Sequence, residues 1–219
     1  MVSGAAGSTD DGTPASNRGI GIYGGSFNPP HQSHVRLCRA ALQHLPIDRL
    51  HVVVSGDHPH KRGRPDLVSA EHRLAMARLA MRDVPGVVVD DRELHRQGPS
   101  YTSDTLEEFA QQHPGRELFF LIGSDNLPLL PTWHAHHRML ELATVTTYPR
   151  AGDPIDPAQL AALDLTADEC RHLLANVLDL PADDTSSSEL RRQLAQGCEP
   201  LEDVPAPVRI YIDEHALYR

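Results

Sequence analysis

The sequence lacks any apolar run long enough to cross a membrane and any basic, apolar leader at its N-terminus. Its longest apolar runs, such as Leu118 to Ile122, are far shorter than the roughly 20 residues that a membrane-spanning helix needs. A secretory signal would combine a basic start with an apolar stretch, and residues 1–18 contain no such combination. We therefore expect a cytoplasmic protein that does not associate with membranes.

Cysteine is scarce. The three cysteines, Cys38, Cys170 and Cys198, are odd in number and lie far apart in the chain. That spacing excludes a zinc knuckle and gives no disulfide framework. We expect reduced thiols in or near the core and no cysteine-based catalysis.

Positive charge is in deficit. The chain carries 20 Lys and Arg against 30 Asp and Glu, a formal net charge of -10. Such a chain repels a phosphate backbone and an anionic lipid surface, so no nucleic-acid or membrane partner is predicted. Any phosphate-binding site must therefore be built locally.

The remaining pattern is that of one α/β domain. A chain of 219 residues can bury a full core without disulfides or structural metals. Residues 1–18 are small and polar, so they are expected to form a disordered tail before a single domain over residues 19–219. From Gly19 onward, strand and helix patterns alternate. This alternation predicts a Rossmann-like, doubly wound, mainly parallel sheet with helices on both faces.

The apolar spacing also places individual elements. Strands are expected at residues 19–23, 49–54, 87–89, 117–122 and 143–148, and helices near 35–45, 69–81, 102–110, 167–174 and 186–194. Ser69 and either Thr102 or Ser103 are expected to cap two of these helices. Ser186 and Glu189 fit a capping box before a helix that ends at Gly197. Residues 149–181 otherwise follow no clear pattern and resemble an insertion.

The segment 24–34 lies where the first strand gives way to the first helix, which is where an open α/β sheet binds phosphate. Its glycines let backbone amides approach an anion. If the helix begins near Gln32, His31 and His34 both lie over its positive end. An ordinary turn with two solvated histidines is the alternative. A zinc pair is disfavoured because no third ligand is placed nearby.

The order Gly-Ser-Phe-Asn-Pro-Pro-His-x-x-His in this segment resembles the signature of the nucleotidyltransferase superfamily that carries a His-x-Gly-His loop. Further segments resemble one family in it, the bacterial nicotinate-mononucleotide adenylyltransferases of NAD synthesis. These are Arg92-Glu93-Leu94 with Pro99-Ser100-Tyr101-Thr102, Ile122-Gly123-Ser124-Asp125-Asn126, Pro131-Thr132-Trp133, and Thr185-Ser186-Ser187-Ser188-Glu189-Leu190-Arg191. The resemblance therefore covers almost everything from Gly19 onward.

This resemblance implies an enzyme that joins ATP and nicotinate mononucleotide to give deamido-NAD and pyrophosphate. Its cofactor would be Mg²⁺, bound mainly through ATP rather than by protein ligands. Two alternatives stay open: an adenylyltransferase for nicotinamide mononucleotide or phosphopantetheine, and a nucleotide-binding module without catalysis. The expected partners are ATP and a pyridine mononucleotide, and a homo-oligomer is left open.

The resemblance and the residue chemistry together give three sets of site residues. The catalytic set is His31, His34, Lys61 and Arg191. The ATP-binding set adds Gly24, Gly25, Ser26, Phe27, Gly123, Asp125, Ser187 and Ser188 to His31, His34 and Arg191. The acceptor-binding set is Asn28, Tyr101, Thr102, Ser103 and Trp133. No protein residue is expected to bind a metal ion directly.

Several of these residues have an alternative role. Helix amides at Ser187 and Ser188, with Arg191 one turn later, can hold triphosphate oxygens, or can belong to an ordinary capped surface helix. Lys61 can neutralise a leaving pyrophosphate or be a solvated loop residue. Asp125 can contact the nucleotide or cap a helix.

The single tryptophan and the histidines after it are also ambiguous. Trp133 can stack on a pyridine ring or pack as a structural residue. His134, His136 and His137 tempt a metal interpretation, but no carboxylate or cysteine stands at ligand spacing. A solvated helix face is favoured for these three residues.

The sequence departs from the family pattern in three places. Ser33 replaces the glycine between the two histidines, which allows for a slightly displaced phosphate. His58-Pro59 replaces a doubled proline before Lys61, which bears on acceptor preference. Residues 149–152 read Pro-Arg-Ala-Gly where the family has an Arg-Pro-Gly turn, so contacts are not carried over from that turn.

Overall fold

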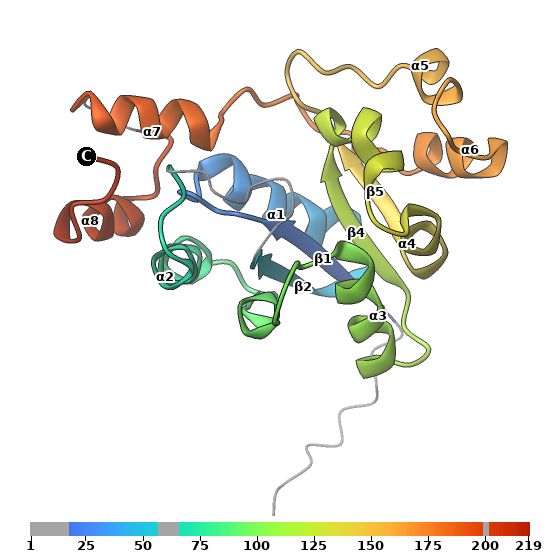
Figure 1. The fold of residues 1–219 in the computed structure, drawn as a ribbon, viewed down its shortest axis with the longest axis horizontal. Coiled ribbons are helices and arrows are strands. Elements are labelled where there is room, and N and C mark those ends of the chain that lie inside the picture. Colours follow the sequence, from blue (N-terminus) through green and yellow to red (C-terminus); the bar gives the residue numbers. More distant parts are fainter. Residues whose placement is uncertain (1–17, 57–65, 199–201) are drawn as a thin grey trace, which may run out of the picture.

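The structure is a computed structural model that describes residues 18–56, 66–198 and 202–219. Its centre is a five-stranded sheet in the order β3-β2-β1-β4-β5, and all neighbouring strands are parallel (Figure 1). The strands are β1 (Gly19–Gly25), β2 (Ile47–Val54), β3 (Val87–Asp90), β4 (Leu118–Gly123) and β5 (Thr144–Tyr148). The predicted doubly wound sheet is confirmed. The strand order reverses between β1 and β4, and at such a point open α/β sheets bind their ligands.

Helices cover both faces of this sheet. They are α1 (Gln32–His44), α2 (Ala70–Met81), α3 (Thr102–Gln112), α4 (His136–Leu142), α5 (Pro157–Ala161), α6 (Ala167–Ala175), α7 (Ser187–Ala195) and α8 (Ala206–Glu214), with 3-10 turns η2 (Arg92–His95) and η3 (Ser124–Thr132). Buried residues of α1, α2, α7 and α8 join one apolar cluster, and those of α3, α4, α5 and α6 join a second. Each cluster belongs to one face of the sheet.

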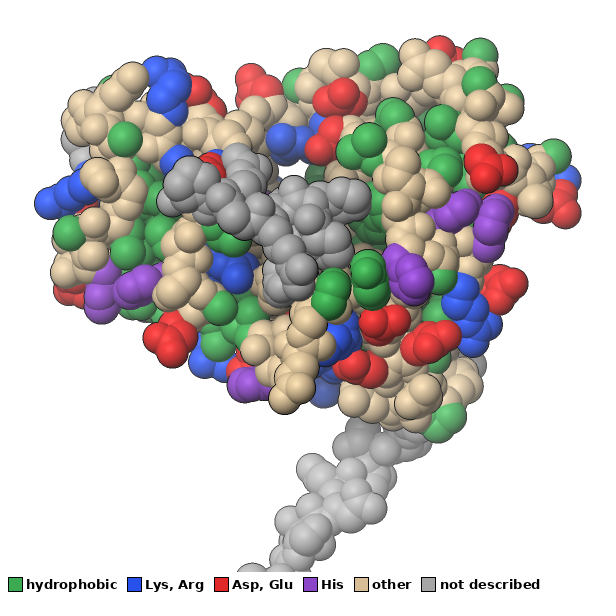
Figure 2. All heavy atoms as spheres, viewed as in Figure 1, with side chains coloured by type: hydrophobic (Ala, Val, Ile, Leu, Met, Phe, Trp, Pro, Cys, Tyr) green, Lys and Arg blue, Asp and Glu red, His purple; other side chains and the backbone are tan. Residues whose placement is uncertain are grey.

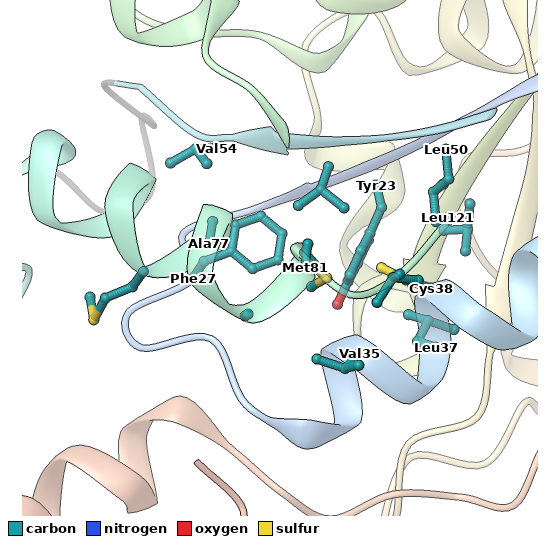
Figure 3. Packing of buried hydrophobic residues seen from close by; sticks show 14 of the residues in the cluster. Tyr23, Phe27, Val35, Leu37, Cys38, Leu50, Val54, Ala77, Met81 and Leu121 are labelled. Atoms are coloured by element: carbon teal, nitrogen blue, oxygen red, sulfur yellow. The ribbon is translucent and has the colours of Figure 1, made fainter. Parts of the chain in front are cut away.

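The core is divided between the two faces because successive side chains of each strand point to opposite sides of the sheet. In β4, Phe119 and Leu121 belong to the first cluster, whereas Phe120 and Ile122 belong to the second. Successive side chains of a strand point to opposite faces, so a fully apolar strand such as β4 supplies both cores. Figure 3 shows the first cluster, in which Leu121 of β4 and Cys38 of α1 lie close to Tyr23 at the end of β1.

The structure corrects several local predictions. α3 begins at Thr102, and its N-cap is Tyr101, whose side chain makes no capping bond, rather than Thr102 or Ser103. Cys38 is buried, but Cys198 is exposed, so the expectation of thiols in or near the core fails for Cys198. The predicted Ser69 and Ser186 caps are confirmed, since their side chains accept the N–H groups of the third residues of α2 and α7. The predicted capping box is only half formed, because the carboxylate of Glu189 bonds to Arg192 and Gln193 instead of the N-cap backbone.

The stretch 149–181 is more than an insertion. It contains α5, which the sequence did not predict, and α6, which it did. Leu160 of α5 and Leu173 of α6 are both buried in the second cluster. These two short helices therefore complete the core beside β5.

Within the described ranges, no helix combines the length and the apolar character that spanning a membrane requires. Acidic and basic side chains are intermixed over the face shown in Figure 2. Residues 1–17 of the predicted tail (1–18) lie outside the described residues, and the carbonyl oxygen of Arg18, its last residue, accepts from Nε of Arg116 at 2.8 Å.

Candidate active site

A cavity of about 520 Å³ lies at the carboxyl ends of β1 and β5, beside the turn that follows β4. Gly24 and Gly25 of β1, Asp125 after β4 and Tyr148 of β5 line one part of it. The loop before α1 (residues 26–31, here called the first loop), the segment 180–183 and the first turn of α7 supply other parts. The cavity therefore lies where the sheet topology predicts a ligand site.

Two stretches far apart in the chain meet in this cavity. The hydroxyl of Ser187 donates to the carbonyl oxygen of Pro29 at 2.9 Å. The Nη1 of Arg191 donates to the carbonyl oxygen of Asn28 at 2.8 Å. The N-terminus of α7 is thus hydrogen-bonded directly to the first loop, and Ser187, Ser188 and Arg191 face the same space as His31 and His34.

The two loop histidines are held in a fixed arrangement. The backbone N–H of His31 donates to Nδ1 of His34 at 3.0 Å, and the two rings stack with centroids 3.6 Å apart. Because Nδ1 of His34 accepts a hydrogen bond, the neutral ring carries its proton on Nε2. His34 is therefore set to donate from Nε2 to a bound anion.

Burial makes His31 a neutral group. Its exposed fraction is 3%, and burial first, with the positive charge of Arg150 second, lowers its pKa to about 3. The ring is therefore uncharged at neutral pH and can bind a ligand only as a hydrogen-bond partner. Its Nδ1 is fully buried and faces the backbone N–H of His34 at the start of α1, without a regular hydrogen bond.

Arg191 is not a free cation. Its guanidinium pairs with the carboxylate of Asp66, and its side chain is only 12% exposed. The same Nη2 lies 3.2 Å from the hydroxyl oxygen of Ser188. These contacts fix the guanidinium at the cavity wall before any ligand arrives, which lowers the entropy lost on binding.

Asn28 holds the first loop in place. Its Nδ2 donates to the carbonyl oxygen of Asp66 at 2.8 Å, and its Oδ1 accepts from the hydroxyl of Tyr218 at 2.8 Å and the N–H of Val68 at 3.3 Å. The side chain is 4% exposed. Its amide is therefore engaged by the protein itself, and the residue lines the cavity with the predicted ATP-binding residues, apart from the other predicted acceptor residues.

Sequence reasoning missed the arginines around this cavity. Arg36 and Arg150 both line it, and Nη2 of Arg150 donates to the carbonyl oxygen of Thr185 at 3.0 Å. Arg73 of α2 is 3% exposed and donates from Nη1 to the carbonyl oxygens of Ser26 and Ser55, at 3.1 and 2.8 Å. Arg73 thus ties the first loop to the end of β2. The sequence offered one signal for Arg73: it directly precedes the predicted apolar stripe of α2, so its side chain could turn toward the core.

A side chain at position 123 would disturb Asp125. A Cβ on Gly123 would lie 2.2 Å from Oδ1 of Asp125, closer than real Cβ atoms come, so the carboxylate would have to move. Asp125 lines the cavity. Gly123 itself is the residue before η3, and Asp125 is not its cap.

Four of the five predicted acceptor residues form a second group. Tyr101, Thr102, Ser103 and Trp133 are not among the lining residues of the cavity in the described part of the chain. The ring of Tyr101 lies 4.2 Å from that of His134, measured between centroids. This contact brings the N-terminus of α3 beside the loop that carries Trp133. Trp133 also packs edge-on against Phe120, at 6.3 Å.

A buried carboxylate supports this second group. Glu93 is 8% exposed, and burial raises its pKa. Its Oε1 accepts from the hydroxyl of Thr105 at 2.7 Å, and its Oε2 accepts from the N–H of Gly56 at 3.3 Å. Glu93 therefore joins α3 to the end of β2. The predicted catalytic Lys61 lies outside the described residues.

The histidine string after Trp133 lies on the surface. Nδ1 of His137 is 2.6 Å from Oε1 of Glu169, and the hydrogen bond to this carboxylate raises the pKa of His137. Over the ranges that the structure describes, no three His, Cys, Asp or Glu side chains are grouped so that they could hold a metal ion.

Comparison with known proteins gives consistent matches. Residues 22–193 match the family described as cytidylyltransferase-like. A protein of Albidiferax ferrireducens named probable nicotinate-nucleotide adenylyltransferase is 40% identical over 91% of this chain and 98% of its own length. Proteins of the same name from Rhodopirellula baltica and Thermus thermophilus are both 37% identical, over 97% and 91% of this chain and 99% of each relative.

Solved structures agree with the fold. A Plasmodium falciparum nicotinic acid mononucleotide adenylyltransferase in complex with NaAD superimposes with a TM-score of 0.73, over 92% of this chain and 97% of that one, at 20% identity. The same Plasmodium protein in complex with APC gives a TM-score of 0.73 at 21% identity. At these identities the likeness concerns the fold alone.

Proposed function

This chain belongs to the nicotinate-nucleotide adenylyltransferases of the cytidylyltransferase-like family, and we propose that it transfers the adenylyl group of ATP to nicotinate mononucleotide. The products are deamido-NAD, for NAD synthesis, and pyrophosphate. One observation carries the proposal: the first loop and the N-terminus of α7 are hydrogen-bonded around a single cavity that His31, His34 and Arg191 line. This is the arrangement a triphosphate requires, with amides, imidazoles and a guanidinium around one space.

The reaction needs no covalent enzyme intermediate. A phosphate oxygen of the acceptor attacks the α-phosphorus of ATP, the bond from that phosphorus to the bridging oxygen breaks, and the electron pair leaves with pyrophosphate. The chain's own contribution is positioning and charge stabilisation. His34 donates from Nε2 to phosphate oxygens, and the neutral His31, which lines the same cavity, is proposed to donate to them as well.

Positive charge around the cavity would stabilise the leaving group. Arg191 is already fixed at the wall by Asp66, and Arg150 lies opposite the first loop in the same lining. Lys61, which falls outside the described residues, is proposed for the same role. Mg²⁺ would bind mainly through ATP oxygens and water and would neutralise phosphate charge. The described residues offer no cluster of their own for it.

The acceptor is proposed to bind beside the second group. The N-terminus of α3 carries Tyr101, Thr102 and Ser103, and amides at a helix N-terminus suit the carboxylate of nicotinate. Trp133 is close by through the Tyr101–His134 contact, and its indole can stack on the pyridine ring. The cytoplasmic location expected from the sequence is part of the same proposal.

Pyrophosphate release tests the proposal. The full chain is incubated with ATP and Mg²⁺ and, in turn, with nicotinate mononucleotide, nicotinamide mononucleotide and phosphopantetheine. We expect rapid release with nicotinate mononucleotide and at least tenfold lower kcat/KM with the other two acceptors, because a buried site made for a carboxylate leaves its donors unpaired with an amide. Faster turnover of either other acceptor would reassign the substrate. Tight ATP binding without turnover of any acceptor would indicate a nucleotide-binding module.

A further inference from the structure

Asp183 is a junction between three segments that line the cavity. Its Oδ1 accepts from the hydroxyl of Ser33 at 2.7 Å, and its Oδ2 lies 2.5 Å from Nη2 of Arg36. The same Nη2 donates to the Ser33 oxygen at 2.9 Å, which closes a three-membered network. We call Ser33, Arg36 and Asp183 the clasp. Ser33 and Arg36 belong to α1, whereas Asp183 belongs to the segment that leads into α7.

The clasp is continuous with the N-terminus of α7. Oδ1 of Asp183 also accepts the N–H of Thr185 at 3.0 Å, and the carbonyl oxygen of Asp183 accepts the N–H of Ala151 at 3.2 Å. Two residues after Thr185, the helix begins at Ser187, whose hydroxyl reaches the first loop. A change at Asp183 therefore acts on the helix end that lines the cavity. Partial burial opposes it, but the bonds from Arg36 and Ser33 hold the pKa of Asp183 below its usual range.

We propose that the clasp holds α1 against the segment 183–186 and so sets the affinity of the cavity for ATP, with Ser33 as a positioning residue. This proposal deepens the proposed function, because it takes ATP as the ligand of the cavity. Ser33 stands where the family pattern has glycine, and its hydroxyl is 8% exposed within the network rather than free. Its role is to prepare the site before binding, which lowers the entropic cost of association.

The clasp can have a large effect on affinity because the carboxylate of Asp183, which accepts its hydrogen bonds, is charged. Hydrogen bonds to an ionised carboxylate are stronger than bonds between neutral groups, and losing one from a part-buried site weakens what depends on it by roughly tenfold. The clasp touches no reacting atom. The affinity for ATP should therefore change, while the rate of the bound complex should stay nearly constant.

The test is calorimetric binding of a non-hydrolysable ATP analogue, with Mg²⁺, to the full chain and to Ser33→Ala, Asp183→Asn and the double variant. We expect Kd to rise about fivefold for Ser33→Ala and about tenfold for Asp183→Asn. The double variant should resemble Asp183→Asn alone, since both changes remove one shared contact. A merely structural role would lower the unfolding temperature of the variants and leave Kd unchanged, and that result overturns the proposal.

Asp168→Asn is the matched control. Asp168 pairs with Arg171 on the exposed surface of α6, with side-chain exposures of 82% and 75%, and should leave Kd unchanged. Ser33→Gly restores the family residue and should weaken binding as Ser33→Ala does. Tighter binding by Ser33→Gly would show that the hydroxymethyl group obstructs the nucleotide, and would overturn the clasp.

Steady-state kinetics complete the test. With nicotinate mononucleotide as acceptor, KM for ATP should rise by the same factors as Kd, with kcat within about twofold and KM for the acceptor unchanged. An equal fall of kcat in both single variants would overturn the proposal. Kd is measured without nicotinate mononucleotide, so the binding experiment tests the clasp independently of turnover. If the native chain binds the analogue but shows no turnover, the proposed reaction is refuted, and the Kd values of the variants still decide whether the clasp is correct. A native chain that does not bind the analogue refutes both.

Discussion

Two histidine groups in this molecule have opposite environments. His31 and His34 are stacked at the start of α1, and burial lowers the pKa of His31 to about 3. His136 and His137 lie at the start of α4, and the carboxylate of Glu169 raises the pKa of His137 at an exposed position. Both groups look alike in the sequence as short histidine strings.

The difference shows what makes a histidine useful for phosphate chemistry. In the first pair, His31 is buried and His34 half-buried, the bond from the His31 N–H to His34 fixes their orientation, and both line a cavity. In the second pair, the rings lie at the surface, where His136 contacts the carbonyl oxygen of Asp164 and His137 the carboxylate of Glu169, and they do not line this cavity in the described part of the chain. A pattern of residue types identifies candidates, but burial and a fixed tautomer decide which can act on a ligand.

The largest effect is predicted for a substitution in the first pair, His31 and His34. His34→Ala removes a donor to the transferred phosphate and should lower kcat about 100-fold or more, with the fold intact. Pyrophosphate release and the unfolding temperature measure the two effects. His137→Ala, the matched change in the second group, should leave kcat unchanged. Unchanged turnover in His34→Ala would remove this residue from the mechanism.

The second prediction concerns pH and stability. The pKa of His31 in the folded chain, about 3, lies below its ordinary value of 6.5. Between these values the unfolded chain binds a proton that the folded chain does not, so stability is complete above pH 6.5 and is lost as the pH falls. Between pH 7 and pH 5, the free energy of unfolding should fall by about 2 kcal/mol more in the native chain than in His31→Asn.

Urea unfolding at pH 7, 6 and 5 measures this difference. His137→Asn serves as the control with the opposite sign. Because the folded-state pKa of His137 is raised, that histidine stabilises the fold at low pH and loses its effect as the pH rises. If the free energy of unfolding depends on pH in the same way for the native chain and for His31→Asn, His31 is not desolvated in the folded chain.

Much of the fold followed from the sequence because the strands are short apolar runs between helices. β2 and β4 are buried along almost their whole length, and such strands occur in parallel sheets covered on both faces. α5 and α8 were not predicted. α5 has only five residues, too few to be stable alone, so its helix depends on packing of Leu160 against the second core.

The site was only partly predictable for a related reason. The first loop and the α7 cap have local signals, namely glycines, a proline pair and a serine three residues before a glutamate. Arg36 and Arg150 have no such signal, and Arg73 has only its place one residue before the predicted apolar stripe of α2. Arg73 looks like a surface residue of α2, and only the tertiary fold places it beneath the first loop, where it meets the carbonyl oxygens of Ser26 and Ser55. Arg150 and Asp183 belong to a stretch without periodicity.

The smallest predicted effect tests whether the acceptor belongs to the second group rather than to the cavity. Trp133→Ala should raise KM for nicotinate mononucleotide roughly tenfold, which corresponds to the loss of one aromatic stacking contact. KM for ATP should stay within about twofold, since Trp133 is not among the described residues that line the cavity. Initial rates at varied concentrations of each substrate measure both constants.

Stability and selectivity controls make this last prediction decisive. Trp133 packs against the second core beside Phe120, so Trp133→Phe, which keeps an aromatic face, should recover most of the acceptor affinity. Leu129→Ala changes a 53% exposed side chain of the same turn and should alter neither constant. If Trp133→Ala raises KM for ATP as much as KM for nicotinate mononucleotide, the cavity and the second group act as a single binding site. The proposed separation of the nucleotide and acceptor regions would then be wrong.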